Sequence, residues 1–269
     1  MGKVKISTVE TASFSMDCCR FGSGKKTFVI LPGLSVQSVM GFADSVYEAY
    51  KVFAEEYTVF LFDRRKDLPE TYSIREMAED TAEALKTLGL EHVSLFGASQ
   101  GGMIAMEIAV GHPELVGKLV LGSTAASADE ERSRTVEDWI GLAESGDREG
   151  LYLAFGEAIY PKEMFEVSRD LFTEAAKTVT DEDLHRFVTL ARGLKGFDIT
   201  EELPKISCPV LVLGSEDDRV LGADAPREII EHLGDRNTAV LYMYDGYGHA
   251  AYDTAPDYRE RILNFLSSV

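Results

Sequence analysis

The stretch VSLFGASQGGMIAMEIA, residues 93–109, decides the fold of this chain. It opens with the apolar run 93–96, closes with the apolar segment 103–109, and holds Ser99 between them. A strand that turns sharply into a helix around one serine is typical of the nucleophile elbow G-x-S-x-G. Gly97 and Gly101 leave space where side chains would collide with the helix or the neighbouring strand. We therefore predict that Ser99 lies exposed above a sheet edge as a nucleophile.

An oxyanion hole is expected beside this serine. The helix after Ser99 points unpaired backbone N–H groups and the positive end of its dipole toward the reacting centre, so the N–H of Gln100 is one predicted donor. The second donor is expected in the loop that follows the apolar run 27–31, from the N–H of Leu34. Gly33 would let this loop approach the elbow closely.

A nucleophilic serine also needs a base and an acid that orients the base. Of the five histidines, His249 lies in a glycine-rich loop between the last expected strand and the last expected helix. This loop can reach the carboxyl edge of the sheet, so His249 is the predicted base. The acid is expected after the strand that ends at Gly214. We favour Asp218, because the apolar pair 220–221 follows it, and keep Asp217 as the alternative acid.

Length and composition favour one large α/β domain with an insertion. The chain has 269 residues, of which 45% are hydrophobic. Strands that alternate with amphipathic segments predict a parallel sheet covered by helices on both faces. Because the sequence contains neither a long apolar run nor a signal-peptide pattern, we expect a soluble, unanchored chain.

Charge and cysteine content narrow the partners. The chain has 46 acidic and 27 basic residues and a formal charge of −19, which argues against nucleic acid and anionic membranes as partners. Three cysteines, Cys18, Cys19 and Cys208, suit a reducing cytoplasm. No metal-ligand spacing surrounds them, and we predict no metal and no cofactor. Cys18 and Cys19 are neighbours on an alternating stretch, so one is expected to face the core and the other not.

Further apolar runs are expected to supply the other strands. An opening pair is predicted at residues 4–9 and 13–21, with a hairpin turn at 22–26 leading into the run 27–31. Later strands are predicted at residues 57–62, 118–121, 209–214 and 239–243. Ser73 and Glu76 have the spacing of a capping box that starts a helix, which Gly89 ends.

Strand signals disappear between residues 125 and 205. This segment has helical patterns, the single tryptophan Trp139 and several further aromatic residues. We interpret it as a helical lid inserted into a core made of residues 1–124 and 206–269. Its aromatic side chains are expected either to pack the lid helices on one another or to line a substrate pocket.

These motifs together resemble the α/β-hydrolase family. The elbow, the Pro32-Gly33 loop, an acid after the Gly214 strand and a late Gly-His occur in the order nucleophile, acid, histidine. The resemblance implies an eight-stranded, mostly parallel sheet with a lid after the sixth strand. Two departures stand out. Pro32 replaces a histidine that many members have, and Leu34 rather than further glycines follows Gly33, unlike the HGGG-type lipases and esterases.

The leading hypothesis is a serine hydrolase that cleaves a small, neutral or apolar carboxylic ester through an acyl-enzyme. One alternative is a ligand sensor of the same fold with slow turnover, which alone would require a protein partner. Amide or iminopeptide hydrolysis, C–C bond hydrolysis and acyl transfer could use the same three residues. The sequence leaves the natural substrate open.

Overall fold

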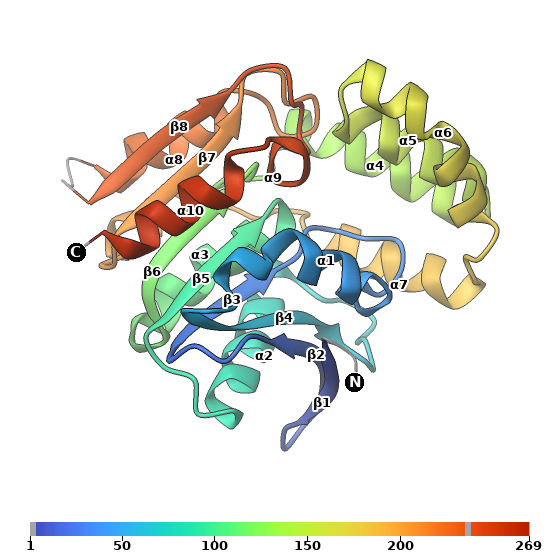
Figure 1. Cartoon of the computed structure of the whole chain (residues 1–269). Coiled ribbons are helices and arrows are strands. Elements are labelled where there is room, and N and C mark those ends of the chain that lie inside the picture. The colour runs from blue at the N-terminus through green and yellow to red at the C-terminus, as the bar shows by residue number, and fades with distance from the viewer. Residues whose placement is uncertain (1–3, 235–237, 269) are drawn as a thin grey trace.

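A computed structural model describes residues 4–234 and 238–268, whose strands form one central sheet (Figure 1). Within these residues the sheet has eight strands in the order β1-β2-β4-β3-β5-β6-β7-β8. The outer strands β1 and β2 pair antiparallel, β2 is antiparallel to β4, and all pairings from β4 to β8 are parallel. The strands are β1 (Lys5–Glu10), β2 (Ser15–Phe21), β3 (Lys26–Leu31), β4 (Tyr57–Arg65), β5 (Val93–Ala98), β6 (Val116–Gly122), β7 (Val210–Ser215) and β8 (Ala239–Tyr244). The predicted mostly parallel, eight-stranded sheet is confirmed.

Helices cover both faces of this sheet and enclose two apolar cores. The core on one face includes residues of α2, α3 and α8, and the core on the other face includes residues of α1 and α10. The helices of the described chain are α1 (Ala43–Tyr50), α2 (Ile74–Thr87), α3 (Gln100–Gly111), α4 (Glu130–Glu144), α5 (Arg148–Ile159), α6 (Lys162–Ala176), α7 (Asp181–Arg192), α8 (Ala225–Leu233), α9 (Ala251–Thr254) and α10 (Tyr258–Ser267). Short 3-10 helices are η1 (Val39–Phe42), η2 (Lys51–Phe53), η3 (Pro113–Leu115) and η4 (Thr200–Lys205).

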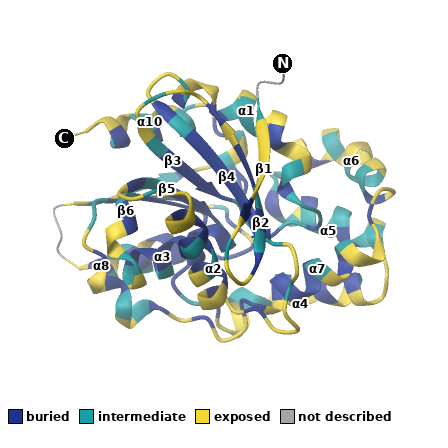
Figure 2. Ribbon diagram, turned by 90° about the horizontal axis from the view of Figure 1, so that it is seen from below, coloured by how far each residue is buried: buried dark blue, intermediate teal, exposed yellow. Residues whose placement is uncertain are grey.

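Alternate side chains along each strand point to opposite faces of the sheet and pack into the two cores. In β3, for example, Val29 packs into the core under α2 and α3, and Ile30 packs into the core under α1 and α10. The central strands are buried, whereas β1 at the sheet edge is mostly exposed (Figure 2). The prediction that only one of Cys18 and Cys19 is buried is wrong. Both thiols are buried, one in each core, because helices cover the two faces of β2.

The predicted hairpin between β2 and β3 is also wrong. Strand β4 lies between them, and Val59 of β4 pairs with Phe21 on one side and with Phe28 on the other. The connecting loop instead crosses the start of β4, where the Thr58 hydroxyl donates to the Gly24 carbonyl oxygen at 2.8 Å. Turn residues between two apolar runs predict a reversal, but which strand fills the gap is decided by long-range pairing.

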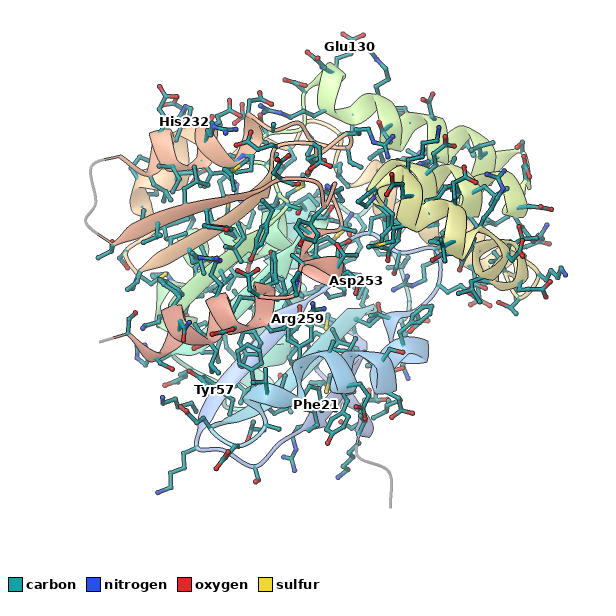
Figure 3. The ribbon with its side chains drawn as sticks, turned by 45° about the horizontal axis from the view of Figure 1, so that its top comes forward. Phe21, Tyr57, Glu130, His232, Asp253 and Arg259 are labelled. Carbon is teal, nitrogen blue, oxygen red and sulfur yellow. The ribbon has the colours of Figure 1, made fainter. Side chains whose placement is uncertain are left out.

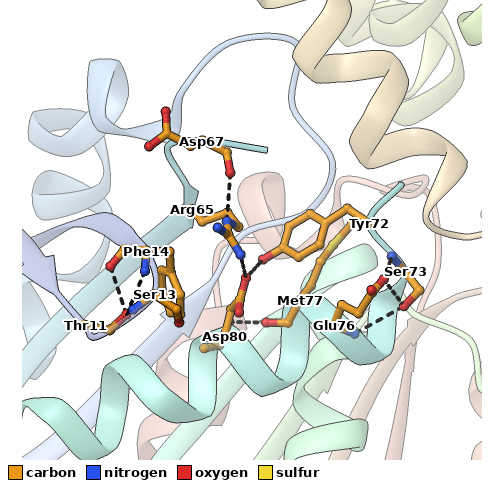
Figure 4. A network of polar contacts seen from close by, with 11 residues as sticks. Thr11, Ser13, Phe14, Arg65, Asp67, Tyr72, Ser73, Glu76, Met77 and Asp80 are labelled. Carbon is orange, nitrogen blue, oxygen red and sulfur yellow. Dashed lines mark hydrogen bonds and ion pairs between the residues drawn. The ribbon is translucent and has the colours of Figure 1, made fainter. Parts of the chain in front are cut away.

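The connection from β4 to α2 is fixed by polar contacts that the sequence anticipates in part (Figure 4). The Ser73 hydroxyl accepts from the N–H of Glu76, and the Glu76 carboxylate accepts from the N–H of Ser73, so the predicted capping box is confirmed. Asp80 on α2 accepts from the Tyr72 hydroxyl at 2.7 Å and from Arg65 Nη1 at 3.3 Å. These bonds join the end of β4 to the first turns of α2.

Four helices, α4 to α7, lie in the chain between β6 and β7 (Figure 1). Helices α4, α5 and α6 stand beyond the carboxyl edge of the sheet, and α7 returns toward it (Figure 1). The Arg186 guanidinium on α7 forms an ion pair with Asp63 near the end of β4. The predicted helical character of residues 125–205 is thus observed, apart from the isolated strand bridge between Ser127 and Asp198.

Helix α3 packs directly against the sheet because two glycines leave room for backbone contact. A Cβ on Gly97 would lie 2.2 Å from the carbonyl oxygen of Gly101, and a Cβ on Gly101 would lie 2.2 Å from the carbonyl oxygen of Leu31. Neither backbone atom can rotate away as a flexible side chain could. The sequence expectation for these two glycines is therefore met by close packing at the turn.

We predict that Gly97→Ala lowers the free energy of unfolding by about 1–3 kcal/mol, because the added methyl overpacks a backbone contact. The matched control is Gly141→Ala in α4, where an added Cβ meets nothing within 4 Å. That control should raise stability by about 0.5–1 kcal/mol through helix propensity. Urea denaturation of both variants measures the difference, and equal midpoints for Gly97→Ala and the wild type would contradict the packing argument.

Candidate active site

Ser99 occupies a strained turn between β5 and α3. Its backbone has φ 52° and ψ −123°, a conformation that non-glycine residues rarely adopt. Two hydrogen bonds hold the turn: the N–H of Ser99 donates to the Gly122 carbonyl at 2.8 Å, and the Thr124 hydroxyl donates to the Ser99 carbonyl at 2.7 Å. The side chain is thereby presented at the carboxyl edge of the sheet, as the elbow motif predicts.

The loop after β3 lies against this turn. A Cβ on Gly33 would lie 3.2 Å from Ser99 Cβ and 3.8 Å from Ser99 Oγ, so only a glycine gives the loop this approach without displacement. Leu34 follows it and is buried, and Gln100 is buried at the first position of α3. The first N–H groups of a helix have no intrahelical partner. The two predicted oxyanion donors therefore come from segments that flank Ser99.

His249 and Asp218 form a buried pair after β8 and β7. His249 Nδ1 lies 2.8 Å from Asp218 Oδ2, and the two side chains are 3% and 2% exposed. An ionised carboxylate only accepts hydrogen bonds, so Nδ1 carries the proton and Nε2 remains as the basic nitrogen. Strands β5, β7 and β8 run parallel, so their carboxyl ends bring Ser99, Asp218 and His249 to the same edge.

The Asp218 carboxylate is held in its ionised form. Burial by itself would raise its pKa, but the electrostatic interaction and hydrogen bond with His249, together with two backbone N–H groups, keep the pKa below its ordinary value. The N–H groups of Val220 and Leu221 donate to Oδ1 at 2.8 and 3.0 Å, which leaves Oδ2 for the histidine. The apolar pair that favoured Asp218 in the sequence thus supplies the bonds that orient it.

Asp217, the alternative acid, binds the histidine loop by its backbone rather than the imidazole ring. Its Oδ1 accepts from the Ser215 hydroxyl at 2.8 Å and from the N–H of Gly246 at 3.2 Å. Its Oδ2 accepts from the N–H of Gly248 at 3.0 Å. The two consecutive carboxylates therefore have different partners: Asp218 binds the His249 ring, and Asp217 binds the backbone of the loop that carries it.

Arg64 is a site residue that the sequence analysis missed. Its guanidinium is buried at the end of β4, and Nη2 donates to the Pro32 carbonyl at 2.9 Å and to Gln100 Oε1 at 3.2 Å. Arg64 therefore bridges the two segments that carry the predicted oxyanion donors. Burial lowers its pKa to about 10, an effect that neighbouring Asp63 partly offsets. The available signal was the charged run 63–65, which follows the apolar run 57–62 and has Arg64 at its centre.

Gln100 extends this network to the inserted helices. Its Nε2 donates to the carbonyl of Leu190 on α7 at 2.8 Å. The side chain next to the elbow serine thus contacts both the core arginine and the insert. Such a buried amide, with both of its polar atoms bonded, fixes the position of α7 relative to the turn.

A cavity of about 500 Å³ adjoins the site on the α1 face of the sheet. Its walls include the oxyanion loop, Ala98 before the elbow serine, and residues of α1, α5, α6 and α9. Most of the lining is apolar, as in pockets that bind small organic molecules. Inserted aromatic side chains pack on one another and also line this cavity: Trp139 packs on Phe155 with ring centroids 4.5 Å apart, and Tyr152, Phe155 and Phe172 are in the lining.

No cluster of three or more His, Cys, Asp or Glu side chains in the described residues could hold a metal ion. Among the helices of the described residues, none has both the length and the apolarity needed to cross a membrane.

Comparison with known sequences gives a consistent result. The sequence profile described as "Alpha/beta hydrolase family" matches residues 28–260. A relative from Rhizobium rhizogenes named "Putative carbamate hydrolase RutD" is 27% identical over 232 residues, which cover 80% of this chain and 85% of the relative. A protein of the same name from Escherichia coli O157:H7 is 27% identical over 227 residues, covering 81% and 84%.

Solved structures share the fold. MGS-M2, an alpha/beta hydrolase enzyme from a Medee basin deep-sea metagenome library, aligns with a TM-score of 0.86 at 20% identity over 98% of each chain. The esterase EaEST from Exiguobacterium antarcticum aligns with a TM-score of 0.80 at 22% identity over 100% of each chain. The enol-lactonase from Burkholderia xenovorans LB400 aligns with a TM-score of 0.81 at 16% identity, covering 97% of this chain and 100% of that structure.

We predict that Asp218→Asn loses stability in a pH-dependent manner. Because the folded pKa of Asp218 is depressed, the ionised carboxylate stabilises the fold above the unfolded pKa of about 4, and this contribution disappears as pH falls through the folded value. The difference in free energy of unfolding between wild type and variant should be full at about pH 5–6 and shrink below about pH 4.

Urea unfolding of both proteins across that range measures the effect. The control is Val212→Ala in the buried part of β7, which removes no titratable group and should destabilise by the same amount at every pH. A pH-independent difference for Asp218→Asn would show that the carboxylate is not stabilised by these contacts.

Proposed function

The chain belongs to the alpha/beta hydrolase family and is a hydrolase, and from that premise we propose that it cleaves carboxylic esters through an acyl-enzyme on Ser99. The observation that carries this proposal is the buried His249–Asp218 pair, at the same sheet edge as the strained Ser99 turn. In this proposal Ser99 is the nucleophile, His249 the general base and Asp218 the acid that orients it.

The first half of the reaction transfers the acyl group to the enzyme. His249 Nε2 takes the hydroxyl proton of Ser99 while Oγ bonds to the acyl carbon. The carbonyl oxygen becomes an oxyanion that accepts from the N–H groups of Leu34 and Gln100. The bond from the acyl carbon to the alcohol oxygen then breaks, and the departing alcohol receives the proton from Nε2. Asp218 stabilises the imidazolium that exists between these two proton transfers.

The second half releases the acid. A water molecule gives a proton to His249 Nε2 and attacks the acyl carbon, and the same two N–H groups hold the second oxyanion. The bond to Ser99 Oγ breaks, Oγ regains a proton from Nε2, and the carboxylic acid leaves. Each oxyanion donor would contribute on the order of a hundredfold to a thousandfold to the rate.

The cavity supports a neutral, mostly apolar substrate. Its volume of about 500 Å³ suits a small organic molecule, and its lining is mainly apolar. The formal charge of −19 disfavours the approach of anions. We propose that residues 125–205 act as a lid over the core, since Tyr152 and Phe172 of the insert line the same cavity as Leu34 of the core.

Carbamate hydrolysis is the second candidate, because relatives covering most of the chain carry that name. The same residues would attack a carbamate carbonyl in the same way. Carbamate itself, however, would fill only a small part of a cavity of about 500 Å³. The cavity therefore favours an ester with a larger organic group.

A cytoplasmic location is proposed for the same protein. Cys18, Cys19 and Cys208 are free thiols, and burial raises the pKa of Cys19 and of Cys208 to about 11. Unpaired cysteines of this kind suit a reducing compartment.

We predict that Ser99→Ala abolishes both hydrolysis of nitrophenyl esters and labelling by a fluorophosphonate, because both require the Oγ nucleophile. Ser94→Ala, which lies on the same strand away from the elbow, is the matched control and should keep both activities. Retained labelling of Ser99→Ala would rule out Ser99 as the nucleophile.

The substrate preference follows from specificity constants for a series of nitrophenyl esters, a nitrophenyl carbamate and an aminoacyl arylamide. Rapid multiple turnover, with higher specificity constants for the esters than for the other substrates, supports the proposal. A higher specificity constant for the carbamate or the arylamide would make that compound class the substrate in place of the ester. A single slow turnover would favour the ligand sensor.

We predict that Arg64→Met lowers kcat about tenfold with little change in KM, because misaligned N–H groups forfeit part of the hundredfold or greater effect of an oxyanion donor. Arg65→Met is the matched control, since Arg65 pairs with Asp80 on α2 rather than with the segments that flank Ser99 (Figure 4). It should leave kcat within about twofold of wild type. Equal kcat values for the two variants would contradict the bridging role of Arg64.

A further inference from the structure

The mainly apolar cavity has a polar wall built from α1, α9 and α10. Tyr50, Tyr252, Asp253 and Arg259 all line it there. A few fixed polar groups in an otherwise apolar pocket are what orients a ligand. We propose that this wall recognises a neutral oxygen acceptor, such as a ketone, carried on the acyl group of the substrate. The inference rests on the proposed ester hydrolysis and specifies its substrate class.

Asp253 and Arg259 lie beside each other where α9 meets α10 (Figure 3). Arg259 Nη1 donates to the backbone carbonyl of Asp253 at 3.0 Å, which fixes the guanidinium. Arg259 Nη2 and Asp253 Oδ1 form an ion pair at 3.8 Å, which is beyond hydrogen-bond distance, so this carboxylate does not occupy the N–H groups of Nη2. The Arg259 side chain is only 16% exposed, and few water molecules compete for it.

Tyr50 and Tyr252 complete the wall. The Arg259 guanidinium carbon lies 5.4 Å from the centroid of the Tyr50 ring, which holds the cation against α1. The Tyr252 ring lies 6.2 Å from the His249 ring, edge to face. The polar wall is therefore continuous with the proposed catalytic histidine, and a substrate held there is also within the site.

Charge decides which acceptor fits. Asp253 already places a carboxylate beside Arg259, and Asp253 Oδ2 accepts a further bond from the Tyr160 hydroxyl at 2.7 Å. A second carboxylate, from a ligand, would be repelled by Asp253 and by the net charge of the chain. A ketone oxygen accepts from Arg259 or a tyrosine hydroxyl without adding charge.

The acyl group is assigned to this cavity because of how the reaction is oriented. The segment from Leu31 to Leu34 and Ala98 line the cavity, and they adjoin the turn to which the acyl group would be bonded. The alcohol must leave past His249 Nε2 to collect its proton. The acyl chain, which stays bonded to Ser99 until water attacks, then extends along the oxyanion loop into the cavity.

The test compares nitrophenyl esters of oxoalkanoic acids with esters in which a methyl branch replaces the ketone oxygen. The ketone is placed at the fourth, fifth or sixth carbon, because the chain must span the distance from Ser99 to the wall. We expect kcat/KM for the best ketone ester to exceed that of its branched isostere about tenfold, the effect of one good hydrogen bond. Tyr50→Phe and Arg259→Met should each reduce this ratio about threefold or more.

Arg261→Met is the matched control. It lies on the same helix but stacks on Tyr242, with its guanidinium carbon 3.4 Å from the ring centroid. The ratio should be unchanged in this variant. Because Tyr50→Phe removes only a hydroxyl, it keeps the test informative if Arg259→Met fails to fold.

Two negative outcomes are distinguishable. A wild-type ratio near one at all three ketone positions, with esters still hydrolysed, overturns the acceptor wall and leaves the proposed function standing. Absence of ester hydrolysis together with absence of fluorophosphonate labelling overturns the proposed function and the inference with it.

Discussion

The positive φ of Ser99 is the constraint on which the rest of this structure depends. At φ 52° the serine is held in a conformation that its side chain disfavours, and the surrounding contacts must supply the compensating stability. Gly97 and Gly101 allow α3 to press against β5 and β3, and hydrogen bonds to Gly122 and from Thr124 hold the turn on the β6 side. The strain is therefore supported by three parallel strands at once, which is why the turn sits at the centre of the sheet.

A buried polar network joins the Ser99 turn to the loop after β3 and to helix α7. Arg64 contacts the Pro32 carbonyl and the Gln100 side chain, and Gln100 in turn contacts Leu190 on α7. A buried arginine is tolerated because carbonyl and amide oxygens accept from it, and Asp63 adjoins it. The network aligns the two segments that flank Ser99 and fixes one inserted helix against them. Core and insert consequently meet at a defined geometry around the cavity, and both contribute residues to its lining.

Several features could be predicted from local patterns. The sharp turn at Ser99, the Ser73–Glu76 capping box, the helical insert and the bonds that Asp218 accepts from the next residues all rest on neighbouring residues, whose spacing sets their geometry directly. Other features could not. The predicted β2–β3 hairpin was wrong because β4 pairs between those strands. Cys18 and Cys19 are both buried because apolar cores lie on both faces of the sheet. The contacts of Arg64 could not be predicted from local patterns because its partners lie 32 and 36 residues away in the chain.

By itself, the sequence determined which side chains the candidate site contains: one serine at a glycine-flanked turn, one histidine in a late glycine-rich loop, and a pair of carboxylates between them. Local rules suffice for this because each signature is a short segment whose backbone demands specific residues. Only the tertiary structure decided how the carboxylates divide their contacts, with Asp218 on the imidazole and Asp217 on the loop. It alone decided the shape of the cavity and the polar wall of Tyr50, Tyr252 and Arg259. Those residues come from α1, α9 and α10, and only long-range packing across one face of the sheet brings them together.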